Sequence, residues 1–180
     1  MSKGTAEAIQ RQIYKLVGRP NDSQATDREL LRRFTVAQDE GAFEALFRRH
    51  GAMVFAAGNR VLANAHDAED VRQAAFLLLA KKASSQRWQS SIASWLYQTA
   101  YQLALKARTA ATRRARREKA VAPRLPSNPL AEITGQELLT ALDEELLALP
   151  EPLRAPLVLC YLEGVTRDEA AQRRPRRGER

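Results

Sequence analysis

A long helical stretch, SIASWLYQTAYQLALKARTAATRRARR, occupies residues 91–117. A mostly apolar stripe recurs at the spacing of one helix face, and its residues are Ile92, Trp95, Leu96, Thr99 and Leu103. A serine at residue 90 or 91 would cap the start of the helix. The sequence therefore predicts one helix that begins with an apolar stripe and continues into a run of arginines.

Helical spacing also dominates the sequence before this stretch. Thr26 and Glu29 have the spacing of a capping box at a helix start. We expect a second helix over residues 40–62 and a third that starts at Asn64 or His66. The candidate core positions are Leu30, Leu31, Phe34, Phe43, Leu46, Phe47, Val54, Val61, Val71, Ala75, Leu78 and Leu79. No strand-like alternation of useful length appears, so residues 26–119 are predicted to form an all-α bundle.

The sequence VAPRLPSNPL interrupts the helical pattern, and its three prolines cannot continue a helix. We interpret residues 120–130 as a linker between this bundle and a small, incomplete helical domain over 131–172. In that domain, leucines at 138, 139, 142, 146 and 149 follow a capping box at Thr134. A helix over about 153–162 would end at Gly164, and Thr166 would cap a last one. Residues 1–25 form an N-terminal extension, and 173–180 form a basic tail.

The chain has 180 residues, a formal net charge of +8 and a pI near 10.1. Residues 101–124 carry eight basic side chains and one acidic, whereas residues 132–163 carry seven acidic and one basic. This distribution indicates a polyanionic partner for the basic segment. Cys160 is the only cysteine, so no intrachain disulfide is possible. Because no apolar run is long enough to span a membrane and no secretory signal is apparent, we expect a cytoplasmic protein.

Four segments together resemble the extracytoplasmic-function (ECF) sigma factors, the small bacterial initiation factors of RNA polymerase. They are ELLRRFTVAQDEGAFEALFRRHGAMVFAAGNRVL at 29–62, DAEDVRQAAFLLLAKK at 67–82, the stretch at 91–117, and LDEELLALPEPLRAPLVLCYLEGVTRDEAA at 142–171. Their order and the proline-rich gap match the family's region two, linker and start of region four. The resemblance implies that region two binds core RNA polymerase and opens the minus-ten promoter element. Region four would read the minus-thirty-five element with a helix-turn-helix.

The resemblance implies a polymerase-binding surface at the start of the third helix. Its residues would be Asp67, Glu69, Asp70, Gln73 and Phe76. The acids have a second explanation, because carboxylates in the first turn of a helix complement its dipole. Phe76 lies off the apolar stripe, so we expect an exposed anchor there.

Aromatic residues beside the basic stretch suit DNA opening, because unpaired bases stack on aromatic rings. We expect Trp88, Tyr97 and Tyr101 to contact DNA and Trp95 to belong to the core. The loop at about residues 86–91 would hold a flipped base by family resemblance. The basic residues Lys106, Arg108, Arg113, Arg114, Arg116 and Arg117 would then follow duplex phosphates. The alternative for the arginine run is a solvated helix face.

The sequence offers no catalytic set, and we expect neither an enzyme, a cofactor nor a metal site. The pair His66 and Asp70 has the spacing of two helix ligands but lacks a third. The chain continues after Ala171 with QRRPRRGER, in which Pro175 and Gly178 oppose a recognition helix, so region four reads as truncated. The expected partners are core polymerase, promoter DNA and an anti-sigma factor. The alternative is a degenerate sigma factor or basic nucleic-acid-binding regulator that does not initiate transcription.

Overall fold

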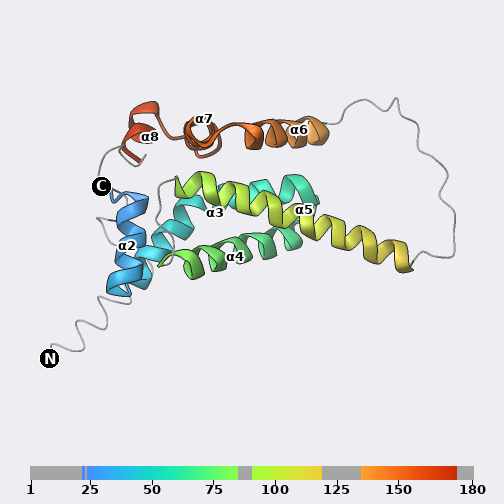
Figure 1. The fold of residues 1–180 in the computed structure, drawn as a ribbon, viewed down its shortest axis with the longest axis horizontal. Helices are drawn as coiled ribbons and strands as arrows, with labels where there is room; N and C mark the ends of the chain where they lie inside the picture. The colour runs from blue at the N-terminus through green and yellow to red at the C-terminus, as the bar shows by residue number, and fades with distance from the viewer. Residues whose placement is uncertain (1–21, 23, 85–90, 119–134, 174–180) are drawn as a thin grey trace.

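The computed structural model describes residues 22, 24–84, 91–118 and 135–173, and the regular elements within these ranges are all helical. The all-α prediction is confirmed. The first bundle contains α2 (Asp27–Ala37), α3 (Glu40–Leu62), α4 (Ala65–Lys82) and α5 (Ile92–Glu118), with α3 packed against the other three. Figure 1 shows that α5 continues well beyond the bundle. The predicted linker at 120–130 lies outside the described residues, as do almost all of the N-terminal extension and the basic tail.

The helix starts follow local side-chain chemistry. Thr26 accepts a hydrogen bond from the Glu29 amide at 3.2 Å, while the Glu29 carboxylate binds Arg32. Asn64 accepts from two amides at the start of α4, at 2.9 and 3.2 Å. Ser91 accepts from the Ser94 amide before α5 at 3.4 Å. The predicted caps at Thr26, Asn64 and Ser91 are therefore confirmed, and each satisfies an amide that lacks a partner in its own helix.

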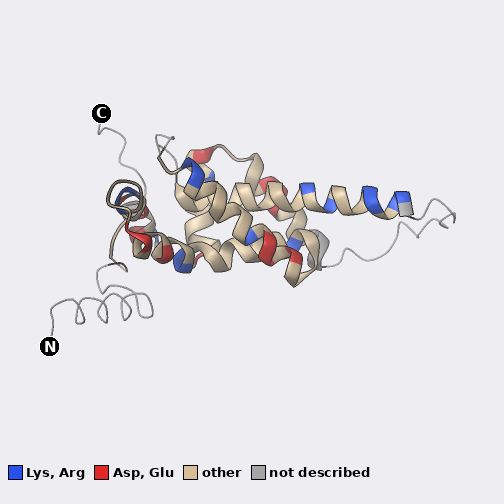
Figure 2. Cartoon of the chain, turned by 90° about the horizontal axis from the view of Figure 1, so that it is seen from below, with Lys and Arg blue, Asp and Glu red and all other residues tan. Residues whose placement is uncertain are grey.

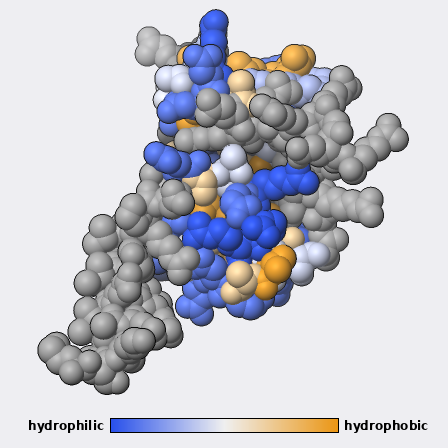
Figure 3. All heavy atoms as spheres, turned by 90° about the vertical axis from the view of Figure 1, so that its left-hand side faces the viewer, coloured by the Kyte–Doolittle hydropathy of each residue, from blue (hydrophilic) through white to orange (hydrophobic). Residues whose placement is uncertain are grey.

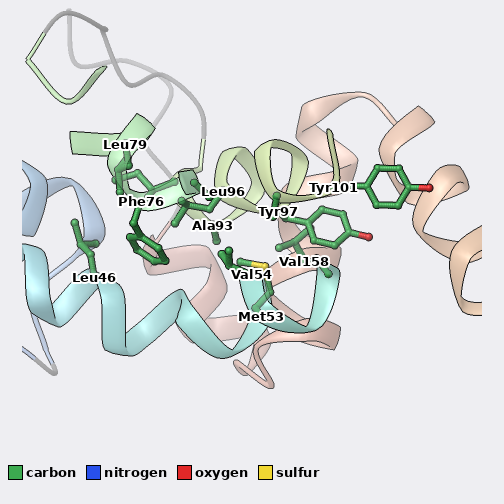
Figure 4. Packing of buried hydrophobic residues seen from close by; sticks show 14 of the residues in the cluster. Leu46, Met53, Val54, Phe76, Leu79, Ala93, Leu96, Tyr97, Tyr101 and Val158 are labelled. Atoms are coloured by element: carbon green, nitrogen blue, oxygen red, sulfur yellow. The ribbon is translucent and has the colours of Figure 1, made fainter. Parts of the chain in front are cut away.

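The core lies where α3, α4 and α5 meet (Figure 4). Most of the predicted core positions are buried, among them Leu46 and Val54 of α3, Leu79 of α4 and Leu96 of α5. The phenylalanines at 34, 43 and 47 are partly buried and pack against this core. Burial of these side chains is the main driving force for assembling the bundle.

The C-terminal elements lie along the first bundle rather than apart from it (Figure 1). They are α6 (Gly135–Ala148), α7 (Glu151–Leu157), the π-helical turn η1 (Val158–Leu162) and α8 (Arg167–Arg173). Val158 and Leu159 are fully buried within the common core, and Figure 4 shows Val158 beside Tyr97 of α5. The surface that a small domain could not cover alone is thus covered by the first bundle.

Two of the predicted turn signals in the C-terminal elements are observed, whereas the predicted capping box at Thr134 begins outside the described residues. Gly164 has a φ of 66°, a conformation that glycine adopts without steric cost. Thr166 and Glu169 form the predicted capping box, since the Thr166 amide donates to the Glu169 carboxylate at 3.0 Å and the Glu169 amide donates to the Thr166 hydroxyl at 3.4 Å.

The face at the α2 end carries hydrophilic side chains across its centre and only small groups of apolar ones (Figure 3).

Candidate nucleic-acid and partner interface

The second half of α5 is an exposed basic rod (Figure 2). The six predicted DNA-contacting cations are all exposed, and they are Lys106, Arg108, Arg113, Arg114, Arg116 and Arg117. This half stays helical although no other described element buries it, because alanine and arginine are strong helix formers. The hydroxyls of Thr109 and Thr112 donate to the carbonyls four residues earlier, at 2.8 and 2.9 Å. The rod can therefore present positive charge in several directions at once.

Two of the predicted DNA-contacting aromatics are not exposed. Tyr97 is fully buried and Tyr101 is 3% exposed, because α6 and η1 lie over this face of α5. The Tyr97 hydroxyl donates to Asp143 at 2.6 Å, and the Tyr101 hydroxyl donates to Glu144 at 3.3 Å. Burial and the neighbouring acids raise the pKa of both phenols. The expectation that these rings are free to contact DNA is therefore wrong for this conformation.

The two tryptophans were predicted to have different roles, Trp95 in the core and Trp88 in DNA contact. Trp95 packs partly buried against the core, as predicted, and the Lys82 ammonium lies 5.8 Å from its ring centroid. Trp88 and most of the expected base pocket at about 86–91 lie outside the described residues. Their contact with DNA stays a prediction.

The predicted polymerase surface is exposed at its polar positions. Asp67, Asp70 and Gln73 are exposed on α4, and Glu69 is partly exposed. Arg72 donates to the Glu69 carboxylate at 2.6 Å, and this hydrogen bond lowers the pKa of Glu69. These residues form a polar face that a partner protein can reach.

Phe76 is 3% exposed, so the expected exposed anchor is wrong. Its ring centroid lies 4.7 Å from that of Phe47 and 6.1 Å from that of Phe43. The aromatic rings of α3 cover it because α4 is buried over a wider arc than the sequence stripe indicated. Phe76 packs against the phenylalanine rings of α3 and does not itself reach a partner in this conformation.

A buried ionic cluster that sequence reasoning missed joins the two ends of the described chain. His50 of α3 is fully buried, with Nε2 3.1 Å from the Asp27 carboxylate and Nδ1 against the Glu163 carboxylate. Arg49 donates to the other oxygen of Asp27. Burial alone would lower the pKa of His50, but Asp27 and Glu163 outweigh it and raise the pKa to about 9. Burial would likewise raise the pKa of Asp27, yet His50 and Arg49 lower it to about 2.

Two more polar clusters hold the C-terminal elements against α3 and α5. Arg60 of α3 binds Asp143 of α6 with two hydrogen bonds, at 2.7 and 2.9 Å. The Ser94 hydroxyl donates to Glu151 at 2.8 Å and accepts from Arg154 at 3.0 Å. Charge-assisted pairs of this kind are short and directional. No local pattern could have identified these partners, because dozens of residues separate them along the chain.

Neither a metal site nor a membrane-spanning helix is found among the described residues. Within the described ranges, no group of three or more histidine, cysteine or acidic side chains is arranged to hold a metal ion. Across the same residues, no helix has both the length and the apolar content that a bilayer span needs. The site consists of the exposed cations of α5, the exposed acids of α4 and the polar contacts that hold the C-terminal elements.

This chain is similar to known proteins over most of its length. Residues 46–116 match the family described as Sigma-70 region 2. The chain is 31% identical over 159 residues to the ECF RNA polymerase sigma factor SigM of Mycobacterium tuberculosis strain ATCC 25618 / H37Rv, covering 87% of this chain and 77% of that protein. The protein of the same description from strain ATCC 35801 / TMC 107 / Erdman is 31% identical over 140 residues, covering 76% and 68% respectively.

Proposed function

Because this chain belongs to the ECF family of RNA polymerase sigma factors and functions in transcription initiation, we propose that it binds core RNA polymerase through α4 and promoter DNA through α5. The observation that carries this proposal is the separation of two exposed surfaces of opposite charge. The start of α4 is acidic and the free half of α5 is basic. We assign region two to residues 26–119 and the start of region four to 131–172. As a family, sigma factors are initiation factors rather than enzymes.

The polymerase contact is tested by removing charge from the start of α4. The variant Asp67→Asn/Asp70→Asn should bind core polymerase about tenfold more weakly, the loss expected for a group at the centre of an interface. Asp168→Asn/Glu145→Gln is the control that removes the same charge, because Asp168 is an exposed acid in the first turn of α8 and Glu145 is an exposed acid of α6. Asp67 occupies the corresponding turn of α4, so both variants weaken a helix dipole interaction. Equal affinity of both variants for core polymerase would remove α4 from the interface.

The duplex contact is tested through the salt dependence of DNA binding. One variant replaces Arg113, Arg114, Arg116 and Arg117 of α5 with alanine. The slope of log affinity against log salt should fall by about 0.9 for each phosphate contact that is lost. A control variant removes the same charge from four exposed arginines elsewhere, namely Arg28, Arg32, Arg48 and Arg167. If both variants change the slope equally, net charge rather than the α5 rod governs DNA binding.

Promoter opening is tested with two templates, one fully paired and one with a pre-melted bubble at the minus-ten element. An active sigma factor supports transcription by core polymerase from both templates. A degenerate sigma factor, the alternative proposal, binds polymerase but gives no transcript from either. A transcript from the pre-melted template alone would mean that DNA opening is lost. An anti-sigma factor stays a partner proposed from family resemblance.

A further inference from the structure

The start of α3 carries an open pocket with aromatic rings and an acidic rim. Its volume is about 360 Å³, and its lining residues are Glu40, Gly41, Phe43, Glu44 and Phe47. The two phenylalanines are only partly buried, and Gly41 has no side chain that could cover them. Aromatic rings that stay within reach at a concave surface favour the binding of another apolar group there.

The two carboxylates determine which apolar partner fits the pocket. Glu40 is exposed and Glu44 is partly exposed, with a carboxylate oxygen 3.5 Å from Arg48 in a pair that is open to solvent. None of the five lining residues is basic. The start of α3 also lies at the end of the bundle opposite to the free half of α5, since only two residues separate it from α2 (Figure 1). A partner that combines apolar side chains with positive charge therefore matches this pocket.

A buried ionic contact brings the N-terminal segment, residues 1–21, to the edge of this pocket. Asp22 is 4% exposed, and its carboxylate accepts from Arg33 at 2.9 Å. Arg33 also donates to Asp39, at 2.8 and 3.1 Å, and Asp39 directly precedes Glu40. The Asp22 carbonyl accepts from Arg49 at 2.9 Å, so the backbone is held as well as the side chain. The N-terminal segment therefore joins the bundle beside the pocket.

The N-terminal segment has the composition that the pocket requires. Four basic side chains and one acidic side chain give it a net charge of +3. Its apolar side chains recur at the spacing of one helix face, and they are Ile9, Ile13, Leu16 and Val17.

The lengths of the segment and the pocket also agree. A helix over residues 9–17 would be about 14 Å long, and the eight residues of α3 from Glu40 to Phe47 rise about 12 Å. Val17 lies five residues before Asp22, and an extended chain of that length spans up to about 17 Å. The apolar stripe can therefore reach the pocket and cover its length.

We propose that residues 9–17 bind in the pocket at the start of α3, with the apolar stripe over Phe43 and Phe47 and the positive charge of the segment near Glu40 and Glu44. A segment of the same chain is favoured over a separate partner, because the anchor at Asp22 keeps it at a high effective concentration beside the pocket. This contact is separate from the proposed polymerase and DNA contacts and requires neither of them.

Hydrogen exchange of the full chain, measured by mass spectrometry, tests the docking of the stripe. We expect exchange in residues 9–17 to be about tenfold faster in Ile13→Ser/Leu16→Ser than in the unmodified chain, because an undocked segment opens freely. Ala8→Ser/Tyr14→Ser is the control, since it introduces two serines at positions off the stripe. Equal exchange rates in the three proteins would show that the stripe does not dock. Equal acceleration in both variants would refute the stripe as the contact surface.

The same measurement tests the acidic rim. Glu40→Gln/Glu44→Gln should accelerate exchange in residues 9–17 about threefold at low salt, the effect expected for two solvent-exposed charge contacts, and high salt should reduce the difference. Glu145→Gln/Asp168→Asn is the matched control, because it removes two exposed acids of α6 and α8, and Asp168 lies in the first turn of its helix as Glu40 does. If both variants accelerate exchange equally, net charge rather than the pocket attracts the segment.

Zero-length cross-linking with a carbodiimide identifies which chain supplies the segment. The sample is an equal mixture of unlabelled and nitrogen-15-labelled full chain, and mass spectrometry identifies the linked peptides. We expect a lysine of residues 1–21 to be joined to Glu40 or Glu44, with both peptides of one isotopic form. Linked peptides of mixed isotopic form would assign the pocket to the segment of a second copy. A pocket without such links, together with rapid exchange in residues 9–17, would leave it to a separate partner. Either result overturns the inference.

Discussion

The stability of this protein should fall as the pH rises from about 6.5 to about 9, because His50 is buried as a cation. Its pKa is raised from 6.5 to about 9 by Asp27 and Glu163, so the folded state holds a proton that the unfolded chain releases over this range. The stabilisation is complete below the unfolded pKa and is lost as the pH passes through the folded value. A difference of about 2.5 pKa units corresponds to about 3 kcal/mol.

Loss of the proton leaves a buried cluster with an unbalanced charge. With His50 protonated, the two acids Asp27 and Glu163 face two cations, His50 and Arg49. With His50 neutral, one negative charge lacks a balancing cation in a place that water does not reach, which is costly. Because Glu163 follows η1 while Asp27 begins α2, we expect the loss to weaken the attachment of the C-terminal elements in particular.

Urea unfolding followed by far-ultraviolet circular dichroism at several pH values measures this effect. The unmodified chain should lose up to about 1.4 kcal/mol of unfolding free energy per pH unit within the window. His50→Gln should be less stable below the window and should have a flatter pH profile. His66→Gln is the control, because His66 is exposed and should leave the profile unchanged. If the unmodified chain and His50→Gln lose stability with the same slope, His50 is not the buried cation and the assignment is wrong.

Three further predictions concern the packing and the helix ends, and the same unfolding assay tests them. Leu159→Ala should lower the free energy of unfolding by about 2–5 kcal/mol, because the side chain is fully buried. The control Leu153→Ala, at a residue 58% exposed, should lower it by less than about 0.5 kcal/mol. Similar losses in the two variants would contradict the docking of η1. Asn64→Ala should cost about 1 kcal/mol by removing the cap of α4, and no loss would mean that the cap is dispensable. Ala63→Gly should stabilise the chain by about 0.5–1 kcal/mol because Ala63 has a φ of 51°, and a lower melting temperature would refute this reasoning.

Features that depend on neighbouring residues were predictable from the sequence. The second helix was expected over residues 40–62, and the structure shows α3 over Glu40–Leu62. The caps at Thr26 and Asn64 also follow from residues two or three positions apart. Helix period, capping and turn chemistry act within one or two turns, so a single sequence contains all the information that they need.

Contacts between distant segments were not predictable. His50 and Glu163 are 113 residues apart, and nothing beside either residue distinguishes it from an ordinary surface side chain. Tyr97 and Tyr101 were expected on a DNA-facing surface because aromatic residues adjoin a basic run. The sequence could not show that α6 and η1 cover these rings in the folded chain. A local pattern identifies the chemistry of a face but not the segment that lies on it.

The orientation of α6 shows why hydrophobic spacing alone is an incomplete guide. The leucines at 138, 139 and 142 define an apolar stripe, and such a stripe ordinarily marks the buried face. Here the facing surface of the bundle offers Arg60 and two phenol hydroxyls, and covering these donors with leucine would leave them without partners at a cost of about 1–3 kcal/mol each. The acids satisfy the donors, so α6 docks through Asp143 and Glu144, and the leucines at 138, 139 and 142 stay exposed. The chemistry of the receiving surface, rather than the stripe, determined which face of α6 was buried.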